Sequence, residues 1–262
     1  MAKRAFAGGR MLGELALFVA VGFAAQLIDG AIGMAYGLFA TSVLLSLGIP
    51  PATASASVHV AEVFTTGASG LAHWRMGNVR RELVLRLAVP GALGGVLGAY
   101  LLSAAPTGAM RVGVSLYLIG LGALILLKAL RPRPPAELPP RQTGILGFCG
   151  GALDAIGGGG GWGAIVTSTL IGRGGVPRTA IGSASLAEFF VTAAISAAFA
   201  VVIGVSLWPV ILGLVLGGVL AAPIAALMVR RLPGRVLMAA VGAVVSLLAL
   251  RSLLAALRVG GG

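Results

Sequence analysis

Long apolar runs separated by short polar stretches cover almost the whole chain. A helix that crosses a bilayer needs about 20 consecutive apolar residues. Runs of that length, each predicting a transmembrane helix, occupy residues 51–72, 83–103, 112–130, 179–203, 207–229 and 236–257. The pattern therefore predicts an all-α polytopic membrane protein.

Two further apolar runs, 13–48 and 143–174, are each interrupted by glycine and an acidic residue. As one straight helix the first run would be about 54 Å long, whereas the hydrocarbon core of a bilayer is about 30 Å thick. Each run must therefore break, and we expect the breaks at 29–33 (DGAIG) and 154–161 (DAIGGGGG). Each broken run is then either a re-entrant hairpin or two short crossing helices.

The second half of the chain repeats the first. Shifts of 125 residues before the break and 126 after it align Asp29/Asp154, Gly33/Gly158, Pro51/Pro177 and Glu62/Glu188. Chance similarity between apolar runs matches leucine and alanine, and does not readily match aspartate, glutamate and proline. We therefore predict one membrane transport domain over 1–262, with repeats at 12–130 and 143–257 and a Pro/Arg-rich linker at 131–142.

The loop arginines indicate that the two repeats are inverted. The loop at 73–86 carries four arginines, while its counterpart at 204–208 carries none. The loop at 103–111 carries one, while its counterpart carries Arg230, Arg231 and Arg235. Arginine concentrates on one side of a membrane, so opposite bias places matched loops on opposite sides. Inverted halves with paired interrupted helices are typical of secondary transporters, whose substrate site lies at the repeat interface. The fold class predicted is thus two inverted repeats with about eight membrane elements.

Composition agrees with a membrane location. The chain is 58% hydrophobic and 10% charged, whereas soluble domains carry about 25% charged residues. The net charge of +12 comes from arginines that lie between the apolar runs, which favours topology-setting loop charge over nucleic-acid binding. We therefore expect a multi-pass protein of the bacterial or archaeal inner-membrane type. Its partners are then the lipid bilayer and a small anionic substrate but no nucleic acid, and a homodimer is permitted.

Enzymatic function is not indicated. The chain has no HExxH motif, no GxSxG motif and no metal set containing two histidines. Its single cysteine, Cys149, excludes an internal disulfide and a cysteine-based metal cluster. We expect no catalytic residues, no cofactor and no metal ion.

Four of the seven acids lie inside apolar runs and form the matched pairs Asp29/Asp154 and Glu62/Glu188. An acid at membrane depth is costly and is a functional candidate by default. We expect the glutamate pair to bind the coupling ion, a proton. For the aspartate pair, ion coupling and the capping of free amides at a helix start are both open.

Polar residues follow one face of each acid-bearing helix. The two stripes consist of Ser55, His59, Glu62, Thr66 and Ser69 in the first repeat, and Ser185, Glu188, Thr192 and Ser196 in the second. Two such stripes should face each other or a wet cavity, although Ser and Thr can also simply bond between helices. His59 has the pKa range for proton handling, and packing is the alternative for it.

The broken segments predict an anion site. A helix that starts after a glycine-rich break presents free amides and a positive dipole end. Hydroxyl groups near each break would add donors. The expected substrate-binding residues are Gly33, Gly158, Thr41, Ser42, Thr167, Ser168, Ser57, Ser183 and His59. The alternative is a neutral or cationic solute that the buried glutamates bind directly.

The duplicated motifs resemble those of the TauE/SafE family of permeases, the sulfite exporter family. The resemblance covers nearly all of residues 14–255 and rests on DGAIGMAYG (29–37), IPPATA (49–54), GALGGVLG (91–98), GGGGGWG (157–163) and VPRTAIG (176–182). It implies transport, often export, of sulfur-containing anions such as sulfite or organosulfonates, driven by an ion gradient. The break at 29–33 is less glycine-rich than its partner and departs from the family pattern.

Overall fold

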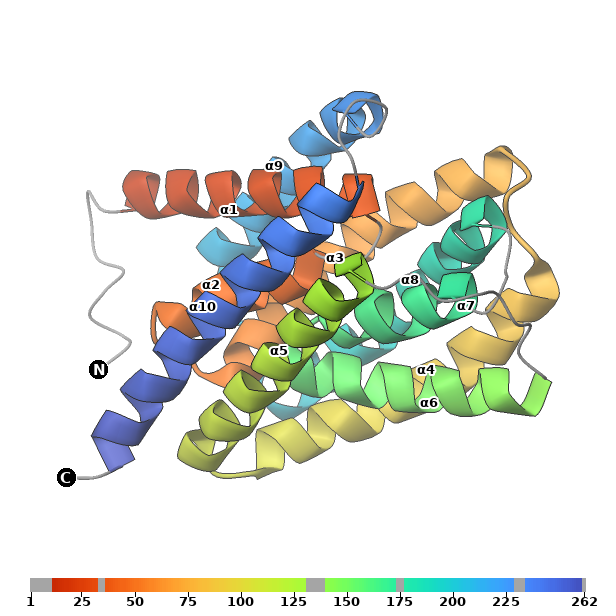
Figure 1. Cartoon of the computed structure of the whole chain (residues 1–262). Helices are drawn as coiled ribbons and strands as arrows, with labels where there is room; N and C mark the ends of the chain where they lie inside the picture. Colours follow the sequence, from red (N-terminus) through yellow and green to blue (C-terminus); the bar gives the residue numbers. More distant parts are fainter. Residues whose placement is uncertain (1–10, 33–35, 131–139, 173–176, 229–233, 261–262) are drawn as a thin grey trace.

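The chain folds into a helical bundle (Figure 1). The computed structural model describes residues 11–32, 36–130, 140–172, 177–228 and 234–260, and these residues form helices with no strand. The first repeat comprises α1 (Met11–Ile32), α2 (Tyr36–Ser46), α3 (Pro51–Arg75), α4 (Arg81–Ala104) and α5 (Thr107–Leu130). The second comprises α6 (Pro140–Gly157), the π-helical turn η2 (Trp162–Thr167), α7 (Ser168–Gly172), α8 (Pro177–Val202), α9 (Trp208–Met228) and α10 (Gly234–Gly260).

The helices confirm an all-α polytopic membrane protein. Every apolar run predicted to cross the membrane coincides with one long helix. Within the described residues, three spans are long and apolar enough to cross a bilayer by themselves: Arg81–Ala104, Thr107–Leu127 and Thr179–Val202. Most of the predicted linker at 131–142 lies outside the described residues, so the repeat boundaries stay predictions.

Both breaks come later than their aspartates. Asp29 lies within α1, which continues to Ile32, and Asp154 lies within α6, which continues to Gly157. The predicted break segments therefore begin in helix. At the second break, consecutive glycines end the helix. Gly158 and Gly159 have φ values of +74° and +86°. Residues other than glycine rarely adopt this backbone conformation.

The chain reverses direction at the second break. A Cβ atom built on Gly150 would contact Val166, and one built on Gly161 would contact the backbone of Asp154. The segments before and after the break are therefore antiparallel. This reversal is common to a re-entrant hairpin and to two short helices, the alternatives that the sequence left open.

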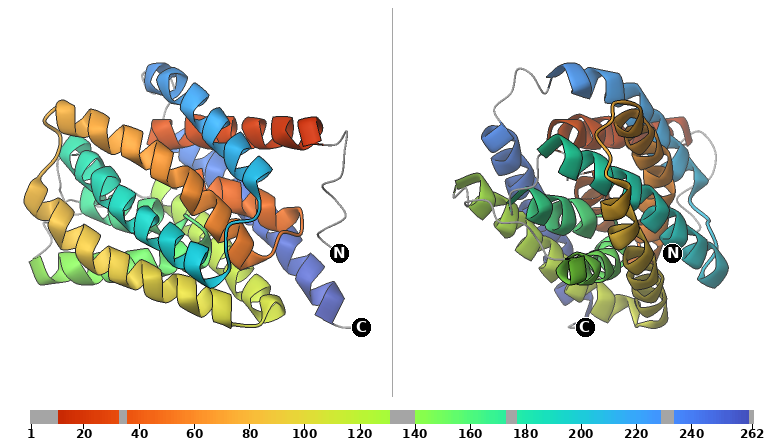
Figure 2. Two further views of the ribbon diagram at one scale, coloured as in Figure 1. Left: turned by 180° about the vertical axis from the view of Figure 1, so that it is seen from behind. Right: turned by 90° about the vertical axis from the view of Figure 1, so that its right-hand side faces the viewer.

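Helices α3 and α8 lie side by side and antiparallel (Figure 2). Gly67 of α3 faces Phe189 of α8, and Gly70 faces Leu186. Helices α5 and α10 are antiparallel as well, since Ser115 Oγ donates to Ser252 Oγ over 3.1 Å while residues near Gly122 face Gly242.

The remaining long helices pair in parallel, α1 with α9 and α4 with α6. Close backbone approach at glycine makes both pairs possible. Gly94 of α4 packs on the backbone of Phe148, and Gly217 of α9 packs on the backbone of Phe23. Gly94 matches Gly217 and Phe148 matches Phe23 in the sequence repeat. The same contact between the halves thus occurs twice.

Exchanging the two repeats leaves this set of helix pairs unchanged. The α1–α9 pair becomes α6–α4, while the α3–α8 and α5–α10 pairs map onto themselves. A two-fold axis that exchanges antiparallel neighbours must be perpendicular to their length. For helices that cross a membrane, such an axis lies in the membrane plane, which is the arrangement of an inverted repeat.

Cysteine labelling tests the inverted arrangement. In a Cys149→Ser background, Met76→Cys places a thiol on the α3–α4 loop and Ser206→Cys places one on the matched α8–α9 loop, both exposed. A membrane-impermeant maleimide should label only one of the two from a given side. Labelling of both from the same side would contradict the inversion.

Candidate functional site

A cavity of about 670 Å³, counting its open mouth, lies between the two halves. Its walls come from α1, α2, α3 and α8 and from the second break. As the repeat predicts, broken segments and acid-bearing helices meet around one space.

The described lining of this cavity contains three carboxyl groups, those of Asp29, Glu62 and Glu188. Glu62 is only 2% exposed, and its Oε2 atom has no hydrogen-bond partner within the described part of the chain. A Cβ atom on Gly159 would lie 2.6 Å from Glu62 Oε1. The Glu62 carboxyl therefore rests directly on the backbone of the break, where only glycine leaves room for it.

Hydroxyl groups supply most of the other polar lining. They belong to Tyr36, Thr65, Thr66, Ser69 and Ser185. Both predicted polar stripes contribute, so the stripes of α3 and α8 do face a common cavity. Among the described residues of the lining, none is arginine or lysine.

The two matched aspartates cap the helices that follow the breaks. Asp154 Oδ1 accepts hydrogen bonds from the backbone N–H groups of Gly161 and Trp162, both 2.8 Å away. Asp29 Oδ1 accepts one from the N–H of Tyr36 at 3.2 Å, and Tyr36 matches Trp162 in the repeat. The capping interpretation is confirmed in both halves, while a role in ion coupling stays a prediction.

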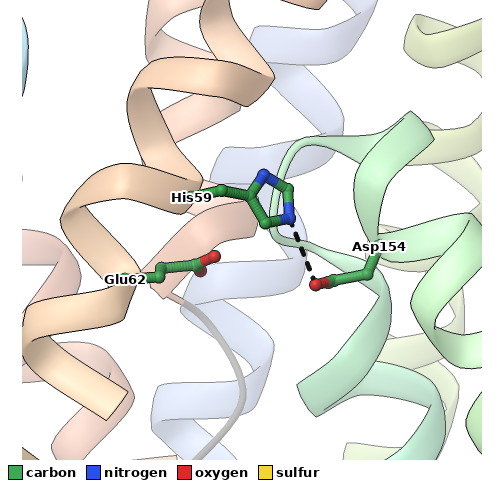
Figure 3. Close-up of side chains that lie close together, drawn as sticks. All are labelled: His59, Glu62 and Asp154. Carbon is green, nitrogen blue, oxygen red and sulfur yellow. Dashed lines mark hydrogen bonds and ion pairs between the residues drawn. The ribbon is translucent and has the colours of Figure 1, made fainter. Parts of the chain in front are cut away.

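His59 pairs with the aspartate of the other half. The fully buried imidazole places Nε2 at 3.3 Å from Asp154 Oδ2 (Figure 3). Its Nδ1 atom lies 2.8 Å from the carbonyl oxygen of Ser55, which can only accept. Nδ1 therefore carries a proton and donates it, so Nε2 is the nitrogen that faces the carboxyl group.

The two halves differ around the cavity. Ser185 occupies the repeat position of His59, and it lines the cavity together with Asp29. On the open side α3 presents Thr65, Ser69 and His73, and the matched positions of α8 are Val191, Ile195 and Phe199. Those three apolar side chains are 0% exposed. The cavity thus extends along α3 as far as His73, while the matched positions of α8 are filled by buried apolar side chains.

Most of the hydroxyls predicted to bind substrate are engaged elsewhere. Thr41 Oγ1 donates to the carbonyl of Gly158. Within helices, Ser168 Oγ donates to the carbonyl of Ala164.

The serines of α3 and α8 are also bonded locally. Ser57 Oγ donates to the carbonyl of Thr53 over 2.8 Å. Ser183 Oγ accepts from the N–H of Arg80 at 2.9 Å, which ties α8 to the loop before α4.

The other predicted substrate contacts are buried or undescribed. Ser42 and Thr167 are buried, and Ser42 Oγ has no partner in the described structure. Gly158 forms part of the break, and Gly33 lies outside the described residues. None of the predicted hydroxyls or glycines belongs to the described lining of the cavity, so their contact with substrate stays a prediction.

Sequence reasoning missed Gln26, Thr65 and His73, which line the cavity. A signal for them exists, since positions 3 and 11 residues after Glu62 share its helical face. Gln26 likewise precedes Asp29 by three residues on α1. Extending each stripe from its acid finds these positions.

Comparison with known proteins also indicates a membrane transporter. The family model "Sulfite exporter TauE/SafE" matches residues 18–252. The "Probable membrane transporter protein YtnM" of Bacillus subtilis (strain 168) is 40% identical over 250 residues, which cover 92% of this chain and 83% of that protein. No solved structure matches the chain. The chain therefore belongs to the TauE/SafE family and is an integral membrane transporter.

Proposed function

We propose that the chain is a secondary-active exporter of a small sulfur-containing anion, such as sulfite or an organosulfonate, coupled to protons through Glu62 and Glu188. The observation that carries the proposal is the pair of repeat-matched carboxyls facing one hydroxyl-lined cavity between inverted halves. The family description supports the class of solute.

Electrostatics link the anion to the protons. Two ionised carboxylates would repel an anion strongly in a buried site. A protonated carboxyl is neutral and can donate a hydrogen bond, as the hydroxyls of Ser69 and Ser185 in the cavity lining can. The anion then binds when Glu62 and Glu188 carry protons, and solute and proton move in the same direction. Export then proceeds when the outward gradient of the solute exceeds the inward gradient of the protons.

The closed side of the cavity supports alternating access. Inverted halves can exchange conformations, so that a site open on one side becomes open on the other. The exchange would open the side now filled by Val191, Ile195 and Phe199 and close the side now lined by Thr65 and Ser69.

A second candidate is a permease for a neutral or cationic solute. The three carboxyls and the absence of arginine or lysine from the described lining favour it. Glu62 and Glu188 would then bind the cargo itself.

Flux in proteoliposomes separates the candidates. An organosulfonate is the better probe than sulfite, because it stays ionised and does not leak across lipid as a neutral acid. We expect sulfonate flux well above that of protein-free liposomes, inhibited by sulfite and unaffected by an organic ammonium ion. Flux of the ammonium ion without flux of the sulfonate would reject the anion proposal in favour of the second candidate.

A further inference from the structure

We propose that His59, Glu62 and Asp154 form a binding site for one divalent transition-metal ion of the Zn²⁺ type. One ligand atom from each residue lies within 4.8 Å of the others. The side chains are 0%, 2% and 0% exposed, respectively. Figure 3 shows the Glu62 and Asp154 carboxyls turned toward each other beside the imidazole. The sequence alone predicts no metal site, because the contact between α3 and α6 is visible only in the folded chain.

The distance between the His59 and Asp154 ligand atoms suits a tetrahedral ion. Zinc with bonds of 2.0–2.1 Å holds its ligand atoms about 3.3 Å apart, and His59 Nε2 lies 3.3 Å from Asp154 Oδ2. The unpartnered Oε2 atom of Glu62 offers the third ligand. Since Glu62 also lines the cavity, the fourth position would face the cavity and be open to water or solute.

The surrounding hydrogen bonds already orient two of the ligands. Metal-bound histidines usually donate their other ring N–H to a carbonyl or carboxylate, and His59 Nδ1 does so to the carbonyl of Ser55. The amides of Gly161 and Trp162 hold Asp154 Oδ1. Oδ2 and Nε2 are thereby left as the atoms that point at the proposed ion.

Charge and ligand type define the class of ion. Two carboxylates and a neutral imidazole balance a dication, which leaves a buried site with no net charge. An imidazole nitrogen with few oxygens suits zinc and similar ions, whereas Ca²⁺ and Mg²⁺ require six or more oxygen ligands. The second half has Ser185 in place of His59, so we expect one ion per chain.

The proposed ion site does not depend on which solute is transported. The effect of the ion on transport, however, rests on the proposed function. A bound ion occupies the Glu62 oxygens that would otherwise accept the coupling proton. The metal should therefore inhibit sulfonate flux and bind less tightly as the pH falls, because protons compete for the same lone pairs.

Cobalt substitution tests the site. Full-length protein, purified in detergent and stripped with a chelator, is titrated with Co²⁺, whose four-coordinate complexes absorb visible light strongly. We expect saturation at one Co²⁺ per chain. The chain has two histidines, which supply a matched pair of variants: His59→Gln should lose the spectrum and His73→Gln should retain it.

Several results would overturn the site: no stoichiometric Co²⁺ spectrum in wild type, an unchanged spectrum in His59→Gln, or its loss in His73→Gln. If His59→Gln does not elute as a single folded species, Glu62→Gln serves instead and should weaken Co²⁺ binding. Sulfonate transport without Co²⁺ binding would reject the site alone, whereas Co²⁺ binding without sulfonate transport would reject the proposed function alone.

Discussion

Replacing either matched glutamate by glutamine is expected to lower sulfonate flux roughly 100-fold or more, since the proton-transferring group is lost. Glutamine keeps the size of Glu62 or Glu188 and can still bond, but it cannot gain and lose a proton. The solute could then bind without completing a coupled cycle. Flux is measured in proteoliposomes at equal protein density, with folding checked by size-exclusion chromatography.

Glu82→Gln is the matched control. Glu82 lies exposed at the start of α4, where its Oε1 atom pairs with Arg86 over 2.5 Å. This acid is remote from the described lining of the cavity, so its removal should leave the flux unchanged. Wild-type flux in both Glu62→Gln and Glu188→Gln would refute the role of the pair.

Asp154→Ala is expected to produce the largest loss of stability, about 3–5 kcal/mol, because it removes one partner of a buried polar pair. The change leaves the amides of Gly161 and Trp162 without their acceptor and the imidazole of His59 without its partner. Asp154→Asn should lie between wild type and Asp154→Ala, since it retains an oxygen for the cap. Thermal unfolding in detergent measures the order.

The repeat supplies the comparison for this prediction. Asp29 holds the same position in the first half, but it is only partly buried and its bond to the Tyr36 amide is longer, at 3.2 Å. Asp29→Ala should therefore cost about 1 kcal/mol, as exposed helix caps do. If Asp29→Ala destabilises as much as Asp154→Ala, burial is not what distinguishes the two caps.

The fold was largely predictable because its dominant signals are local or duplicated. Apolar length locates the helices, and the matched acids reveal the repeat. The breaks were placed too early because an aspartate near glycine reads as a helix end. In the folded chain Asp154 stays helical and reaches forward seven residues to cap Gly161.

The candidate site was predicted in part. The stripes on α3 and α8 correctly indicated a shared polar cavity. The hydroxyls near the breaks were harder, because a serine in a helix can bond to a carbonyl of the preceding turn. Ser57 and Ser168 do so, and composition does not distinguish this local bond from a substrate contact.

The pairing of His59 with Asp154 had no signal in one sequence. The residues are 95 positions apart and belong to different repeats. The packing of α3 against α6 brings them together. The repeat alignment does show that Ser185 stands at the position of His59, so the two halves differ at this point.

Proton movement driven by a solute gradient is the decisive test of coupling between solute and protons. Proteoliposomes containing a pH-sensitive dye are given a sulfonate gradient with no initial pH difference. We expect protons to cross with the sulfonate in wild type, and we expect this movement to be absent in Glu62→Gln and Glu188→Gln. Sulfonate flux in wild type with no accompanying proton movement would contradict the claim that the matched glutamates couple the two.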